Sequence, residues 1–323
     1  MLIVKAKVFS MDFWLIKSFV CDNIEFKRLD NYKKIRDLIR KERQHYQTGT
    51  VTVRIPHEIS DPDKSIDYTI SLLDKCSMLL SFAHNHDVFF NEYTCYEVTD
   101  EKTEPKRSCF ASIVVGKATG PGPNIYSHGL ERFISTTLPL IQNEDFNKET
   151  GISRAIVWYN EALDLGVIET KFLALWMALE IAANSYSEAN PRDFLLLKEE
   201  WNQLMKEFDK LLKRIKITSK EAIDKLYGAL GFARKGHIVD RIAYLLSGYE
   251  LSQYNSEIPT FNKMRNDILH GRTLDYSSKP SSVDNAIKLE RLLVKLVLTI
   301  LNFQDKVNLI HSSILKDDLL ARG

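Results

Sequence analysis

A polar segment late in the chain combines residue types that suit chemistry on a charged ligand. The segment 261–272, FNKMRNDILHGR, contains Arg265, Asn266 and His270. Asn266 and His270 are four residues apart and share one helix face, and the long side chain of Arg265 can bend back toward the imidazole. Histidine exchanges protons near neutral pH, whereas arginine stays charged and can hold an anion. Because Gly271 can end the helix directly after His270, we expect the imidazole to be accessible to a ligand.

The same residues carry a resemblance to a known family. Arg265-Asn266-x-x-x-His270-Gly271 matches the R-x4–6-H motif of HEPN domains, and the segment FLALWMALE at 172–180 looks like a helix of the ApeA-like HEPN branch. The resemblance covers roughly residues 150–310 and leaves out the first half of the chain.

Membership of this family implies a helical bundle that dimerises and places two copies of the motif in one cleft. Many HEPN domains are metal-independent endoribonucleases. By this resemblance, His270 exchanges a proton with the ribose 2′-OH or the leaving 5′-oxygen, Arg265 holds the phosphate, and Asn266 orients the phosphate or the imidazole. Because one motif has a single histidine, a two-fold homodimer would supply the second. The resemblance therefore predicts an endoribonuclease that cleaves RNA by 2′-OH attack, without metal or cofactor, as a defence or toxin effector.

A non-catalytic interpretation of the same residues stays open. Arg265 could pair with Glu180 as a structural link between two packed helices, and His270 could cap its own helix. The chain would then be a HEPN module that dimerises and binds a protein or nucleotide partner.

Two basic clusters and one histidine pair could bind ligands elsewhere. Lys213 and Arg214 end one predicted helix, and Arg234 and Lys235 follow soon after; all four could contact RNA phosphates, although charged runs are often solvated helix faces. The segment HNHD at 84–87 could chelate a metal, but a third ligand is not visible, so we expect a polar turn there and no metal site.

Composition limits the classes of function. The 323 residues carry 44 Lys+Arg against 43 Asp+Glu, and cutting at Gly151 gives 20 basic and 21 acidic residues before it. Neither half is a polycation, so contacts with RNA must be local. The apolar runs are too short for a bilayer, the start lacks the pattern of a signal peptide, and the four cysteines form no C-x-x-C pair. These features predict a cytoplasmic protein with reduced thiols and no membrane contact.

The pattern along the chain predicts two regions. Residues 1–150 read as an α+β domain that senses a trigger or binds a partner, and residues 151–323 read as an all-α helical bundle of the HEPN-like kind. Expected strands are 2–9, 50–55, 88–98 and 109–115, and expected helices in the first half are 31–47 and 65–83. A turn is expected at 116–123. Five or six helices are expected from about Gly151 onward. Four of them are expected to begin at Ser153, at Pro191, at Thr218 or Ser219, and at Pro259, and the last is a long helix at 283–311.

Overall fold

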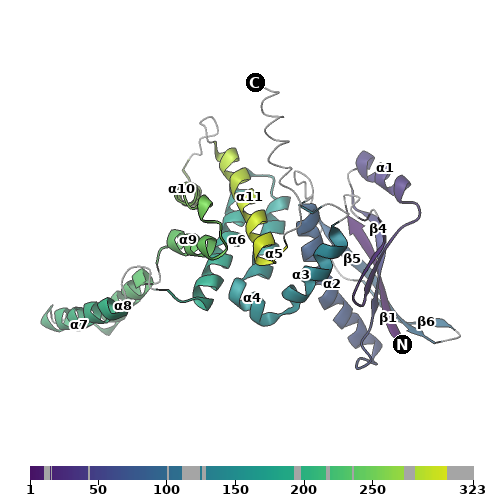
Figure 1. Cartoon of the computed structure of the whole chain (residues 1–323), viewed down its shortest axis with the longest axis horizontal. Helices are drawn as coiled ribbons and strands as arrows, with labels where there is room; N and C mark the ends of the chain where they lie inside the picture. The colour runs from purple at the N-terminus through teal and green to yellow at the C-terminus, as the bar shows by residue number, and fades with distance from the viewer. Residues whose placement is uncertain are drawn as a thin grey trace, which may run out of the picture.

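The computed structural model describes residues 1–10, 15, 17–42, 44–99, 102–110, 124–125, 129–192, 198–215, 219–234, 236–272 and 281–303. An antiparallel sheet comes first and a mostly helical region follows, so the predicted order of an α+β part and a helical part is confirmed. Figure 1 shows the sheet at one end of the long axis and the helical region extending away from it.

The sheet has six strands in the order β2-β3-β4-β1-β5-β6. Every strand pairs antiparallel with its neighbours. Along β1, Val4 and Val8 are fully buried whereas Lys5 is exposed, as expected for a strand with one covered face. The strands are β1 (Leu2–Ser10), β2 (Phe19–Cys21), β3 (Ile24–Arg28), β4 (Tyr46–Arg54), β5 (Val88–Val98) and β6 (Thr103–Cys109).

Helix α2 (Pro62–His84) covers one face of the sheet, as Figure 1 shows. Its start is capped by Asp61, whose side chain accepts a hydrogen bond from the Lys64 backbone N–H at 3.0 Å. Its end is set by Asn85, which adopts the left-handed conformation with φ 53°. The smaller helix α1 (Tyr32–Glu42) lies on the other side of the sheet, near the N-terminal end of β4.

The helical region is organised around α6 (Ile168–Ala189), which contacts α4, α5, α9, α10 and α11. Trp176 and Leu179 are buried on it, and Lys171 forms an ion pair with the mostly buried Glu290 of α11 at 2.9 Å. The other helices are α3 (Leu130–Gln142), α4 (Glu144–Thr150), α5 (Ile152–Asp164), α7 (Lys198–Ile215), α8 (Lys220–Arg234), α9 (Ile238–Gly248), η1 (Ser252–Tyr254), α10 (Ile258–Leu269) and α11 (Ser282–Ile300).

One hydrophobic core runs from the sheet into the helices. At their junction, the Tyr159 hydroxyl of α5 donates to Asn85 Oδ1 at 2.7 Å, and Asn124 Nδ2 donates to the same oxygen at 2.9 Å. The Tyr159 ring also packs edge-on against Phe82 of α2, with centroids 5.2 Å apart. This buried polar group therefore ties the last turn of α2 to the first helix after residue 150.

Several element boundaries differ from the predictions. The helix expected at 31–47 ends at Glu42, because Tyr46 already pairs with Ser10 at the start of β4. The prediction that a strand begins at Cys109 is wrong, because strand β6 ends at that residue. Residues 111–123, which include the rest of that expected strand and the expected turn, lie outside the described residues. Helices α3, α4 and α9 and strands β2 and β3 were not identified from the pattern.

The helical boundaries differ in the same way. Helix α5 begins at Ile152 after Gly151 rather than after the expected cap Ser153, and α7 is described from Lys198 rather than from Pro191. Ser219 does cap α8, because its Oγ accepts from the Ala222 backbone N–H at 3.3 Å. From α5 to α11 there are seven described α-helices instead of five or six.

The last helix is shorter than expected. Helix α11 ends at Ile300 because Asn302 adopts φ 50° and the Phe303 N–H bonds back to the Leu298 carbonyl at 2.8 Å. This turn buries Phe303 against the Phe133 ring, with centroids 5.1 Å apart. The expected continuation at 304–311 lies outside the described residues.

Candidate functional site

Helix α10 carries the predicted motif and ends as expected at its histidine. Pro259 lies in its first turn, where no backbone N–H is needed. At its other end, Gly271 has φ 64°, its N–H bonds to the Ile268 carbonyl at 3.0 Å, and the Arg272 N–H bonds to the Asp267 carbonyl at 2.8 Å. These two bonds form a Schellman cap, which places His270 at the final position of the helix.

One face of α10 is buried and fixes the helix on the bundle. Phe261 is fully buried and Met264 nearly so, three residues further along. The Phe261 ring lies edge-on to Phe172 of α6, with centroids 6.3 Å apart. Arg265, one position after Met264, therefore lies at the edge of the α10–α6 contact.

Arg265 is held between two partners. Its guanidinium donates to Asn266 Oδ1 at 3.0 Å and lies 3.8 Å from Glu180 Oε1 on α6. The same Glu180 oxygen accepts a hydrogen bond from the indole N–H of buried Trp176 at 2.7 Å. The structure thus brings Arg265, Asn266 and Glu180 together, and the hydrogen bond from Trp176 holds the Glu180 carboxylate in place.

His270 is exposed at the end of α10. Its backbone N–H bonds to the Asn266 carbonyl at 3.0 Å, and its imidazole makes no hydrogen bond or ion pair with the described part of the chain. The preceding residue, Leu269, is 55% exposed. The imidazole of His270 is therefore open to a ligand. The helix ends through the backbone N–H of His270 and not through its side chain.

Asp267 belongs to the same helix end and was missed by sequence reasoning. It accepts from Lys263 Nζ at 2.7 Å and from Arg272 at 2.8 Å. The hydrogen bonds from Lys263 and then Arg272 lower the pKa of this carboxyl below its ordinary value. The four-residue spacing of Lys263 and Asp267 was the available signal, because such pairs face each other on a helix.

Of the predicted RNA-binding cations, the two whose side chains the structure describes, Lys213 and Arg214, lie away from α10. Lys213 and Arg214 lie in the last turn of α7, which leaves the body before α8 returns to it. Figure 1 shows α7 and α8 projecting from the bundle, with the last turn of α7 far from α10. Arg234 ends α8, but its side chain lies outside the description, and Lys235 lies outside the described residues altogether.

The HNHD segment forms the turn that follows α2. His84 is 2% exposed, and burial, helped by the neighbouring His86, lowers its pKa to about 3. Burial raises the pKa of Asp87. Among the residues that the structure describes, no three His, Cys, Asp or Glu side chains gather as metal ligands would.

Two hollows of about 730 Å³ each lie away from α10. One lies on the open face of the sheet, and the other is lined by α2, α5 and the α3–α4 junction, with Asp74 and Val157 among its residues. The end of α10 lines neither of them. The predicted motif is thus an exposed edge rather than the floor of either hollow.

Cys21, Cys76 and Cys95 are buried free thiols, and Cys109 is a half-buried one. None of the described helices is both long enough and apolar enough to span a bilayer.

Comparisons of the chain with protein-family models, with curated proteins and with solved structures gave no match.

Proposed function

We propose that the chain is a metal-independent endoribonuclease of the HEPN type. The observation that carries the proposal is that one helix end holds both a fixed guanidinium and an open imidazole: His270 ends α10 without a side-chain partner in the described residues, five residues after Arg265. An exposed proton-transfer group near a cation is what cleavage of a phosphodiester requires. The resemblance in the motif adds to this argument but covers only the second half of the chain.

In the proposed reaction, His270 removes the proton from a ribose 2′-OH and the resulting oxygen attacks the adjacent phosphorus. The bond from phosphorus to the 5′-oxygen breaks, and that oxygen takes up a proton from a second acid. Arg265 stabilises the charge on the non-bridging oxygens. The products are a 2′,3′-cyclic phosphate and a free 5′-OH.

A homodimer would complete the site. One motif offers one histidine, whereas the reaction uses both a base and an acid, and a two-fold axis beside α10 would supply the second His270. Leu269 is exposed next to it and can contribute apolar surface to such an interface. Sedimentation should show a dimer at micromolar concentration; a monomer throughout that range would contradict the composite site.

The nuclease proposal is tested with RNA and DNA of one sequence. We expect cleavage of RNA to persist in EDTA, to leave cyclic phosphate ends, and to stop when the 2′-OH at the cut is replaced by hydrogen. DNA should stay intact. Cleavage that EDTA abolishes, or that leaves 5′-phosphates, would contradict the proposed roles of Arg265 and His270.

The second candidate is a non-catalytic HEPN module that binds a partner. The contact between Arg265 and Glu180, backed by the hydrogen bond from Trp176, favours it, because this group also links α10 to α6. An RNA pool left uncut by the pure dimer would support this candidate. In either case, we propose that residues 1–150 sense a trigger or partner and that the protein acts in the cytoplasm, as a defence or toxin effector if it is a nuclease.

A further inference from the structure

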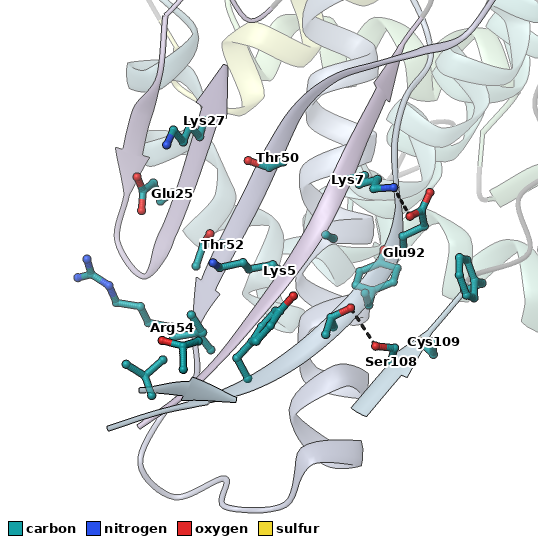
Figure 2. A pocket seen from close by; sticks show the side chains of 18 of the residues that line it. Lys5, Lys7, Glu25, Lys27, Thr50, Thr52, Arg54, Glu92, Ser108 and Cys109 are labelled. Atoms are coloured by element: carbon teal, nitrogen blue, oxygen red, sulfur yellow. Dashed lines mark hydrogen bonds and ion pairs between the residues drawn. The ribbon is translucent and has the colours of Figure 1, made fainter. Parts of the chain in front are cut away.

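The face of the sheet opposite α2 carries polar side chains that are exposed or half-buried, such as Lys5, Thr52 and Arg54. Figure 2 shows side chains from β1, β3, β4, β5 and β6 standing on this face. They line a hollow of about 730 Å³. This surface was not identified from the sequence, because it is assembled from strands far apart in the chain.

Strand pairing arranges these side chains in three rows across the sheet. Neighbouring strands are about 4.8 Å apart, and residues two apart along a strand are about 7 Å apart. Cations therefore occur in every row at these spacings. The rows are Lys27–Thr50–Lys7, Glu25–Thr52–Lys5–Thr94–Ser108 and Arg54–Ile3–Tyr96.

The face carries more positive than negative charge. Its four cations are Lys5, Lys7, Lys27 and Arg54, and its two carboxylates are Glu25 and Glu92. Lys7 pairs with Glu92, as Figure 2 shows, but the ion pairs of the described residues do not include the other three cations. Their charge is thus available to an anionic ligand.

Helix α1 extends the positive surface beside β4. Its exposed side chains include four cations and two carboxylates, so it adds to the excess charge. The cations are Lys33, Lys34, Arg40 and Lys41, and the carboxylates are Asp37 and Glu42.

Hydroxyl groups and aromatic rings stand between the cations. Thr94 and Ser108 share a hydrogen bond at 3.0 Å, and Lys5 Nζ lies 5.2 Å from the centre of the Tyr96 ring. Phe110, on the rim of the hollow, is 76% exposed. Cations that follow a backbone and rings on which bases stack are the two components of single-strand binding surfaces.

We propose that this open sheet face binds a segment of single-stranded nucleic acid. Lys5, Lys27 and Arg54 contact phosphates, and Tyr96 and Phe110 stack on bases. The excess positive charge would attract either phosphates or an acidic protein surface. The half-buried Tyr96 ring and the exposed Phe110 ring favour a nucleic acid, because bases stack on rings and carboxylates do not. The cations span three strands, an area wider than one phosphate group.

This site is separate from the end of α10. Figure 1 places the sheet and α10 at different parts of the long axis, with α2, α5 and α6 between them. The proposal therefore does not rest on the nuclease activity, and loss of one leaves the other in place. A nucleic acid bound here would act as the trigger, or the face would serve as a second binding site for a long RNA.

The test is fluorescence anisotropy of the full chain with a labelled twelve-residue oligo(dT), which lacks the 2′-OH and stays uncut. A Lys27→Glu/Arg54→Glu variant should bind at least about tenfold more weakly, with a shallower salt dependence, because two phosphate contacts are lost. Tyr96→Ala should weaken binding about tenfold through lost stacking. The matched control is Lys148→Glu/Arg154→Glu, the same charge change at exposed positions of α4 and α5, which should bind as the parent does.

Three results would overturn the proposal. The first is equal binding of oligo(dT) by the two charge-reversed variants when their thermal midpoints match. The second is failure of the parent chain to bind oligo(dT) at low salt. The third is displacement of oligo(dT) by thymidine monophosphate at equal concentration. The last result would show that the face holds one nucleotide rather than a strand. The two proposals fail in different measurements: absence of RNA cleavage by the parent chain contradicts the nuclease proposal, whereas equal oligo(dT) binding by the two charge-reversed variants contradicts this one.

Discussion

On the open sheet face, Lys27 and Arg54 extend from the strands without an ion-pair partner among the described residues, whereas at the end of α10 Arg265 is held by Glu180 and Asn266. The first arrangement leaves cations mobile and available, which suits phosphates in varied positions. The second fixes one guanidinium and leaves one imidazole free, which suits a single reacting geometry. A polar group's partners therefore say more about its use than its charge does.

The largest expected effect separates the two surfaces by activity. His270→Ala should lower the rate of RNA cleavage by at least about 100-fold, since general acid–base groups contribute ~10²–10⁴-fold. Its thermal midpoint should match that of the parent, because the imidazole has no partner in the described chain. Thr260→Ala, an exposed position on the same helix, is the control and should cleave normally. A His270→Ala protein that still cleaves RNA would remove this residue from the reaction.

The next effect tests whether Glu180 positions Arg265 or only links two helices. Glu180→Gln keeps an acceptor for the Trp176 N–H but removes the charge beside Arg265. We expect kcat to fall about tenfold with KM nearly constant, because a displaced guanidinium no longer meets the developing charge. The kinetic constants of purified protein on a short RNA measure this split.

Glu180→Ala provides the comparison for that variant. It also leaves the buried indole N–H without an acceptor, so the free energy of unfolding should fall by about 1–3 kcal/mol. Equal kcat for the parent and Glu180→Gln, with stability lost in both variants, would favour the purely structural link.

A smaller effect is expected at the cap that places His270. Gly271 has φ 64°, and the space around it is open, so Gly271→Ala meets no clash but strains the backbone. The free energy of unfolding should fall by about 1 kcal/mol. Gly166→Ala is the matched control, because that position is equally open and has no left-handed φ. Urea denaturation distinguishes them, and equal stability of the two variants would contradict the role of the Schellman cap.

The smallest effect concerns pH. Hydrogen bonds from Lys263 and Arg272 hold the folded-state pKa of Asp267 below its unfolded value near 4. Its stabilising contribution is therefore present above pH 4 and is lost as the pH falls through the folded pKa. Asp267→Asn should reduce the difference in unfolding free energy between pH 6 and pH 3, measured by urea denaturation. An unchanged difference would mean that these bonds persist in the unfolded chain or contribute nothing.

Local patterns predicted some elements well. The bounds of β5 match the expected strand, and the end of α10 at His270 followed from Gly271. Helix α3 was missed because Pro139 interrupts a pattern of otherwise buried apolar residues, and tertiary packing compensates for that proline. The early end of α11 depends on Phe303 packing against Phe133, a contact that lies far away in sequence.

The same distinction applies to the candidate sites. Arg265 and His270 lie on one short helix, so their spacing could be read directly, and Glu180 was found because it can pair with Arg265 across two helices. The open sheet face could not be found in this way, because Lys27 and Lys7 are neighbours only through β4. Strand order, which the sequence pattern does not encode locally, decides which side chains meet.

The buried contact of Tyr159 with Asn85 and Asn124 has a consequence for how the molecule unfolds. Separating the helical region from the sheet would break the buried hydrogen bond between Tyr159 and Asn85 and would expose the Phe82 ring to water. Neither part can loosen first at low cost, so heating should give one cooperative transition rather than two. A nucleic acid bound at the sheet would then raise the melting temperature of the helices as well.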